Sequence, residues 1–129
     1  MRVGSLNHVV LTVNDLAKSR AFYDRLLPQL GHRLIFEEDD SFGFQSADGM
    51  KLLFAQAREH ATFDRYHVGL HHLAFQAPDR AFVDAVHAKL VEWGATILDP
   101  PAAYPQYEKG YYAVFFLDPD GMKLEVVHV

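Results

Sequence analysis

The chain has 129 residues, of which 50% are hydrophobic and 22% are charged, as is ordinary for a soluble globular protein of one domain. Its net charge of −5, without a basic stripe, argues against a nucleic-acid binder. No apolar run approaches the ~20 residues of a membrane span, so we expect a cytoplasmic protein that makes no membrane contact. Because cysteine is absent, any bound metal must be held by imidazole nitrogen and oxygen.

The first half of the chain begins with a predicted strand and helix. Residues 7–13 alternate in a β-rich composition, which predicts a strand. Asn14 or Asp15 can cap the helix that follows, and Pro28 and Gly31 mark its end. Three short strands separated by acidic or glycine-containing turns are predicted next, over residues 33–37, 42–45 and 50–55.

The second half repeats this order after a polar stretch, residues 56–69, which we interpret as a linker. Residues 71–76 predict a strand, and Pro78-Asp79 start a helix that runs to about Trp93. Three further strands are predicted over residues 95–98, 111–117 and 122–129, with a proline-rich loop over residues 99–110 between the first two.

The two halves are also related in sequence. The pentapeptide Asp-Gly-Met-Lys-Leu occurs at residues 48–52 and again at residues 120–124, and residues 6–15 resemble residues 70–79. Each half is therefore interpreted as one βαβββ module, the two modules covering about residues 6–57 and about residues 70–129.

The order of elements predicts an α+β fold. We expect a single domain, residues 1–129, in which the tandem modules form a curled, partly open eight-stranded sheet around a concave metal site.

Three potential metal ligands occupy related places in the repeat. In each strand the more apolar residues should pack beneath a helix, which leaves the polar set, with His8, His72 and Glu125, for the concave side. His8 aligns with His72, and Glu125 follows the second pentapeptide, where the first copy has Leu53. Two imidazoles and one carboxylate suit Fe, Mn, Zn or Ni and leave positions open for a small-molecule substrate. The alternative is two ordinary sheet histidines and a rim carboxylate.

Other residues near this predicted site could take part in its chemistry. The tyrosine-rich loop, residues 104–112, could line a substrate pocket or be packed only by its own side chains. Besides Glu125, we predict Tyr112 as a catalytic residue whose hydroxyl donates to a bound oxygen. Lys123 could instead pair with Glu125, and His71, expected on the face opposite His72, could support a ligand or contact the substrate.

These features resemble the vicinal oxygen chelate superfamily, which includes glyoxalases, bleomycin-resistance proteins and extradiol dioxygenases. The resemblance rests on four segments, residues 7–16, 19–27, 71–75 and 116–125. It implies that His8, His72 and Glu125 are the metal ligands. Glyoxalase I and methylmalonyl-CoA epimerase use a fourth ligand, Glu or Gln, where this chain has Leu53; the remaining His-His-Glu set is similar to extradiol dioxygenases and fosfomycin-modifying transferases.

The resemblance also implies a function. We expect a metal-dependent lyase, isomerase or extradiol-type dioxygenase that captures a small substrate through two adjacent oxygens. The alternative is a metal-free protein that sequesters an antibiotic or other small molecule, as bleomycin-resistance proteins do. Family members of this length imply a homodimer in which His8 of one chain meets His72 and Glu125 of the other.

Overall fold

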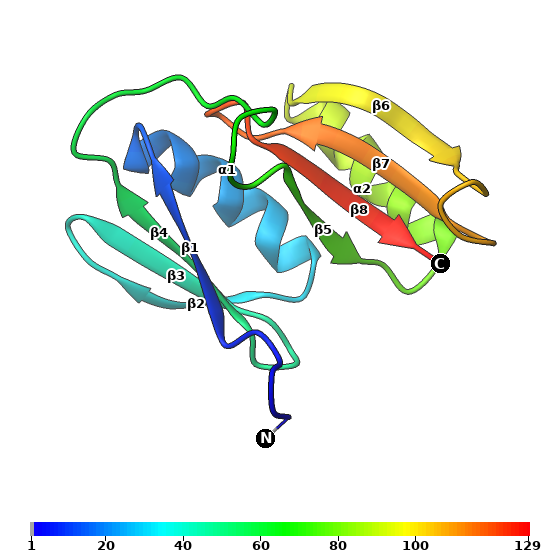
Figure 1. The fold of residues 1–129 in the computed structure, drawn as a ribbon, viewed down its shortest axis with the longest axis horizontal. Coiled ribbons are helices and arrows are strands. Elements are labelled where there is room, and N and C mark those ends of the chain that lie inside the picture. The colour runs from blue at the N-terminus through cyan, green and yellow to red at the C-terminus, as the bar shows by residue number, and fades with distance from the viewer. Residues whose placement is uncertain (1) are drawn as a thin grey trace. The chain divides into compact units, whose positions relative to one another are not determined.

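The computed structural model describes residues 2–129, which divide into two compact units. The first unit ends at Ala61, and the second runs over Thr62–Val129. Each unit has the element order βαβββ, so the predicted α+β fold of two tandem modules is confirmed (Figure 1). The eight strands form two sheets of four. Among residues 2–129, no helix is long and apolar enough to cross a membrane.

The first unit is a mixed sheet with one helix. The sheet has the order β1-β4-β3-β2, with β1 parallel to β4 and the other pairs antiparallel. The side chain of Asp15 accepts the N–H of Lys18 at 3.1 Å, so Asp15 is the helix cap. The elements are β1 (His8–Val13), α1 (Leu16–Gln29), β2 (Arg33–Glu37), β3 (Ser41–Gln45) and β4 (Lys51–Gln56).

One face of this sheet forms the core of the first unit. Tyr23 of α1 is fully buried, and its ring lies 4.3 Å, centroid to centroid, from that of Phe54. Along β1, Leu11 and Val13 are buried, whereas His8 is exposed. The predicted separation of an apolar face from the face that carries His8 is therefore confirmed within this unit.

The second unit repeats the arrangement. Its sheet has the order β5-β8-β7-β6, with β5 parallel to β8 and the other pairs antiparallel. The side chain of Asp79 accepts the N–H of Phe82 at 2.8 Å and caps the helix, whose buried residues include Val83 and Leu90. The elements are β5 (His72–Gln76), α2 (Arg80–Glu92), β6 (Thr96–Ala103), β7 (Tyr112–Leu117) and β8 (Lys123–His128).

Strand β6 is longer than the sequence predicted. We expected a strand over residues 95–98 and then a proline-rich loop, but β6 continues through Pro100 and Pro101 to Ala103. Proline lacks the N–H that an interior strand must donate, but β6 is at the edge of the sheet. Its pairing with β7 is irregular on both sides of Asp99, which lets the prolines lie where no hydrogen bond is required.

Candidate metal centre

The second unit brings together two of the three predicted ligands, His72 and Glu125. His72 is the first residue of β5, and Glu125 lies on the neighbouring parallel strand β8, where it is the register partner of Ala74. The Nε2 atom of His72 lies 3.0 Å from Oε1 of Glu125. The parallel pairing of β5 with β8 therefore creates this contact between residues 53 positions apart.

Glu125 is a buried carboxylate. Its exposed fraction is 1%, and the apolar side chains of Ala113, Phe115 and Val127 form a cluster in the same sheet. An ionised carboxylate in such surroundings is costly unless it is paired. Glu125 faces the imidazole of His72 through one oxygen, and its other oxygen accepts a hydrogen bond from a tyrosine hydroxyl.

That tyrosine is Tyr111, which the sequence analysis placed in the tyrosine-rich loop without predicting its contact with Glu125. Its hydroxyl donates to Oε2 of Glu125. Burial, and then this hydrogen bond to a carboxylate, raise the pKa of Tyr111 far above its ordinary value, so the phenol keeps its proton. The antiparallel register pairs Phe115 with Glu125. Side chains alternate along a strand, so Ala113 and Tyr111, two and four positions before Phe115, share the face of Glu125.

The prediction that the Tyr112 hydroxyl acts at this site is wrong, because Tyr112 lies on the other face of the sheet. The hydroxyl of Tyr112 donates to Oδ1 of Asp84 at 2.6 Å, and the guanidinium of Arg80 lies 4.8 Å from the centre of its ring. Both partners belong to α2, so Tyr112 lies on the helix-covered face of the sheet and Tyr111 lies with Glu125. Successive strand residues face opposite ways, and the register puts the odd-numbered residues of β7 beside Glu125.

His71 contacts His72 although we expected it on the opposite face. The Nδ1 atoms of the two rings are 2.6 Å apart, so one nitrogen donates a proton to the other. His71 precedes the first residue of β5, where strand alternation does not apply. Desolvation, followed by the positive charges of His72, Lys123 and Arg65, lowers the pKa of His71 and favours its neutral form.

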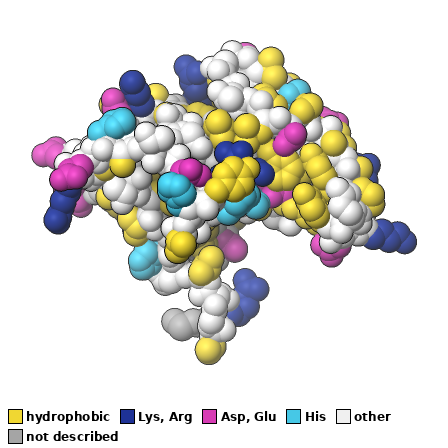
Figure 2. All heavy atoms as spheres, turned by 45° about the horizontal axis from the view of Figure 1, so that its top comes forward, with side chains coloured by type: hydrophobic (Ala, Val, Ile, Leu, Met, Phe, Trp, Pro, Cys, Tyr) yellow, Lys and Arg dark blue, Asp and Glu magenta, His cyan; other side chains and the backbone are white. Residues whose placement is uncertain are grey.

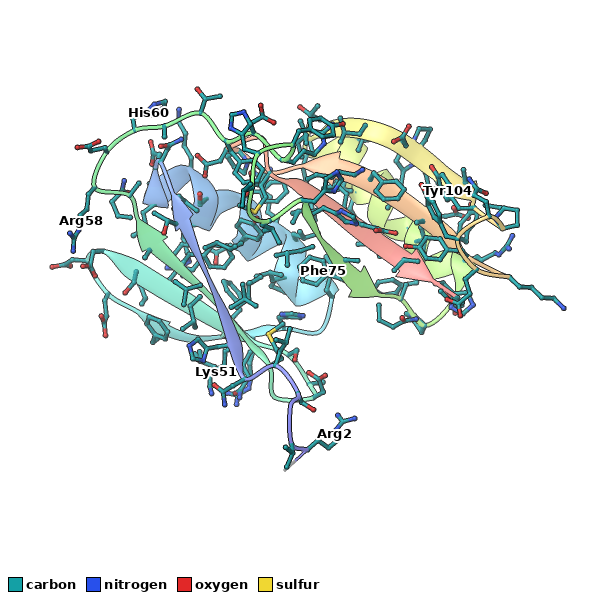
Figure 3. The ribbon with its side chains drawn as sticks, in the orientation of Figure 1. Arg2, Lys51, Arg58, His60, Phe75 and Tyr104 are labelled. Atoms are coloured by element: carbon teal, nitrogen blue, oxygen red, sulfur yellow. The ribbon has the colours of Figure 1, made fainter. Side chains whose placement is uncertain are left out.

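The tyrosine-rich loop is packed by its own rings. Tyr104 stacks on Tyr107 with their centroids 5.4 Å apart, and Tyr107 lies edge-on to Tyr111 at 5.3 Å. Tyr104, labelled in Figure 3, also lies edge-on to Phe115 at 5.5 Å. Hydrophobic side chains gather over the strands of the second unit (Figure 2). The loop therefore builds an aromatic cluster beside Glu125 from its own rings and from contacts with Phe115 and Glu125, and its role in lining a substrate pocket stays a prediction.

Lys123 and His8 complete the set of predicted residues. The Nζ atom of Lys123 lies 4.6 Å from the centre of the Phe115 ring, whereas Glu125 contacts His72. The alternative in which Lys123 pairs with Glu125 is therefore not the arrangement observed.

His8 is an exposed residue of the first unit, with Nδ1 2.8 Å from Oδ1 of Asn7. Its membership of the site stays a prediction. Across residues 2–129, no three His, Asp or Glu side chains form a cluster that could hold a metal ion.

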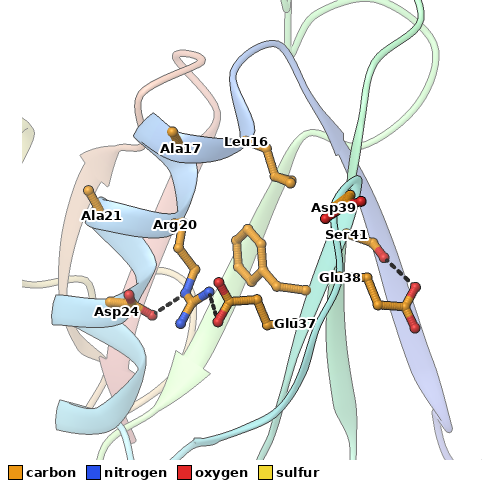
Figure 4. Close-up of a pocket in the computed structure, with 10 residues that line it drawn as sticks. Leu16, Ala17, Arg20, Ala21, Asp24, Glu37, Glu38, Asp39 and Ser41 are labelled. Atoms are coloured by element: carbon orange, nitrogen blue, oxygen red, sulfur yellow. Dashed lines mark hydrogen bonds and ion pairs between the residues drawn. The ribbon is translucent and has the colours of Figure 1, made fainter.

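The first unit contains a pocket of about 620 Å³ between α1 and the turn from β2 to β3 (Figure 4). Its one cationic lining residue, Arg20, is bound at 2.7 Å to Asp24 and at 2.8 Å to Glu37. None of the predicted site residues lines this pocket. We therefore place the candidate site on His72 and Glu125.

The pair fits a divalent metal ion. Two ligand atoms that each lie about 2.1 Å from one ion are about 3.0 Å apart at the right angle of an octahedral site and about 3.4 Å apart in a tetrahedral site. The observed 3.0 Å between His72 Nε2 and Glu125 Oε1 matches the octahedral spacing, so both atoms could bind one ion with little movement of either strand. Imidazole nitrogen and carboxylate oxygen are ligands of the hardness that Fe, Mn, Zn and Ni accept.

Comparisons with known proteins agree on one family. The sequence model of the Glyoxalase/Bleomycin resistance protein/Dioxygenase superfamily matches residues 5–126. Over 125 residues the chain is 34% identical to the uncharacterized protein YqjT of Bacillus subtilis, covering 95% of this chain and 97% of that one. It is also 30% identical over 125 residues to the metallothiol transferase FosB of Lysinibacillus sphaericus, covering 97% and 82% respectively.

A crystal structure from Bacillus halodurans has the same fold. It superposes with a TM-score of 0.86 at 34% identity and covers 98% of this chain and 97% of that one. The sequence match and the shared fold both extend over nearly the whole chain. The protein therefore belongs to the Glyoxalase/Bleomycin resistance protein/Dioxygenase superfamily.

Proposed function

We propose that the protein is a metal-dependent enzyme that acts on a small substrate held through two adjacent oxygens. The observation that carries this proposal is the buried carboxylate of Glu125 at 3.0 Å from Nε2 of His72. These two residues would hold the ion, with His8 as the predicted third ligand. The similarity to FosB, whose name describes a metallothiol transferase, supports metal dependence.

The residues around the pair suit such chemistry. A divalent ion bound there would supply a Lewis acid to the substrate oxygens. Tyr111 holds one oxygen of Glu125, and His71 contacts the other nitrogen of His72. Phe115 is the register partner of Glu125 and Tyr111 bonds to its carboxylate, which is 1% exposed, so water has little access and electrostatic contacts there are strengthened.

Leu53 narrows the range of reactions. It lies on β4, where glyoxalase I and the epimerase would place a fourth protein ligand, and leucine cannot coordinate a metal. A site with three protein ligands leaves more positions for substrate or oxygen. We therefore favour an extradiol-type dioxygenase, or a lyase or isomerase other than an ordinary glyoxalase I.

We also propose that the enzyme is a homodimer in which His8 of one chain joins His72 and Glu125 of its partner. Within its own unit His8 lies on the face opposite the core, where it is accessible to another surface. Mixing His8→Ala with Glu125→Ala protein tests this arrangement. If the site is shared, each mixed dimer regains one complete metal site after subunit exchange. If all ligands come from one chain, no site is regained.

A second candidate function is metal-free binding of an aromatic or apolar small molecule. The aromatic cluster of Tyr104, Tyr107 and Phe115 favours it, since these rings offer a surface for stacking. Retention of a buried carboxylate beside an imidazole favours the enzyme, because a purely apolar binding site gains nothing from that costly pair.

Metal content distinguishes the two functions. We would measure it by elemental mass spectrometry on untagged protein purified without oxygen, alongside Glu125→Gln. About one metal per chain, lost in the variant, is expected for the enzyme. Iron would point to oxygenation, and nickel or zinc to lyase or isomerase chemistry. Absence of metal in the native protein, with none taken up on reconstitution, would overturn the proposal in favour of the binding protein.

A further inference from the structure

The two oxygens of Glu125 have different partners. Oε1 lies 3.0 Å from Nε2 of His72, whereas Oε2 accepts the hydrogen bond of the Tyr111 hydroxyl. We propose that Tyr111 is a positioning residue that orients Glu125 so that Oε1, and not Oε2, is presented to the metal. This inference rests on the proposed function, because it assigns Tyr111 a task at the same metal centre.

A hydrogen-bond donor on one oxygen biases a carboxylate toward binding a metal through the other oxygen. The last torsion of a glutamate side chain has a broad energy minimum, so a free carboxylate can turn and can bind an ion through either oxygen or both. The hydrogen bond from Tyr111 occupies Oε2 and restrains that torsion. With Oε2 directed to Tyr111, Glu125 presents Oε1 to the ion, which favours coordination through one oxygen and leaves a further coordination position for the substrate.

Tyr111 is itself held in place. Its N–H donates to the carbonyl of Glu108 at 3.1 Å, and its carbonyl accepts the N–H of Tyr104 at 2.8 Å. The ring lies edge-on to both Tyr107 and Tyr104, with centroid distances of 5.3 and 6.3 Å. The hydroxyl is therefore fixed by backbone and ring contacts before any metal binds, as an effective supporting group must be.

The experiment compares Tyr111→Phe with Tyr112→Phe. Both changes delete one hydroxyl and keep the ring, but the Tyr112 hydroxyl bonds to Asp84 on the opposite face. Affinity for Co²⁺ and Zn²⁺ is measured by competition with a chelating dye, and the visible absorption of the Co²⁺ protein reports its coordination. Tyr111→Phe is expected to bind metal about 10-fold more weakly or worse and to change the Co²⁺ spectrum. Tyr112→Phe should match the wild type in both.

Wild-type affinity together with a wild-type Co²⁺ spectrum in Tyr111→Phe would overturn the inference and leave the proposed function standing. Wild-type protein that takes up no metal would overturn the proposed function, and the inference with it. If Tyr111→Phe does not fold, 3-fluorotyrosine installed at position 111 of otherwise unchanged protein replaces it. Zn²⁺ should then shift its ¹⁹F resonance, and an unmoved resonance in metal-loaded protein would overturn the inference.

Discussion

The imidazole rings of His71 and His72 are joined through their Nδ1 atoms at 2.6 Å, while Nε2 of His72 is directed to Glu125. His71 thus holds the Nδ1 atom of His72 and leaves the Nε2 atom of His72 for the proposed metal. A metal-binding histidine characteristically donates its second N–H to a nearby acceptor, and this fixes both the tautomer and the ring orientation.

From this contact we predict that His71→Ala weakens metal binding by about 10-fold, because His72 loses the partner of its Nδ1 atom. A matched control is His67→Ala, since His67 is an exposed histidine that contacts Asp64 rather than His72. Zn²⁺ affinity measured by dye competition checks the prediction. Equal affinities of His71→Ala and wild type would show that the contact does not support the ligand.

Metal should also stabilise the fold through Glu125. A ligand that binds only the native state at 100 times its Kd adds about 2.7 kcal/mol to the free energy of unfolding. We therefore expect Zn²⁺ at such an excess to raise the urea midpoint of the wild type and to leave that of Glu125→Gln nearly unchanged. A similar gain in both proteins would mean that Zn²⁺ binds elsewhere on the chain.

The repeat and the alternation of apolar residues were sufficient to predict most of the fold. The order of all ten elements follows from local preferences and from the duplicated pattern, and the structure selects Asp15 over Asn14 as the first cap and gives Asp79 as the second. The prediction ended β6 too early because Pro100 and Pro101 indicate a loop, whereas an edge strand tolerates proline where no hydrogen bond is required.

The site was harder to predict, because it depends on register between strands. The contact between His72 and Glu125 depends on the parallel pairing of two strands, and the repeat indicated both residues. The choice of Tyr112 over Tyr111 needed the antiparallel register across the final turn, which periodicity within one strand does not contain. The contact of His71 arises outside any strand, so no alternation rule could have indicated it.

Asp118 is predicted to stabilise the turn that precedes Glu125. Its buried carboxylate accepts the N–H groups of Asp120 and Met122, each at 2.9 Å. Asp118→Ala removes the acceptor and should lower the free energy of unfolding by about 1–3 kcal/mol. Asp48→Ala is a control from the corresponding turn of the first module, where an exposed carboxylate accepts the Ser46 hydroxyl and the N–H of Met50, the latter at 3.4 Å, and its effect should be smaller because the carboxylate is exposed.

Urea unfolding of both variants checks this prediction. An equal loss of stability in the two would mean that burial of the Asp118 carboxylate adds nothing to the turn, and a loss only in Asp48→Ala would contradict it outright.

His32 should make the stability of the protein depend on pH. It is 8% exposed, and burial lowers its pKa below the ordinary value, with the nearby charge of Asp48 opposing the shift. Between the folded pKa and the unfolded value of about 6.5, the unfolded chain binds more protons, so stability rises with pH. The contribution is thus fully present above about pH 6.5 and is lost as pH falls toward the folded pKa.

We therefore expect His32→Asn to reduce the loss of stability between pH 7.5 and pH 5.5, while the exposed His60→Asn keeps the wild-type dependence. Urea unfolding at both pH values measures the two differences. Substitution at position 32 also changes packing, which shifts stability equally at both pH values and so cancels from the comparison. An unaltered pH dependence in His32→Asn would show that other groups cause the acid sensitivity.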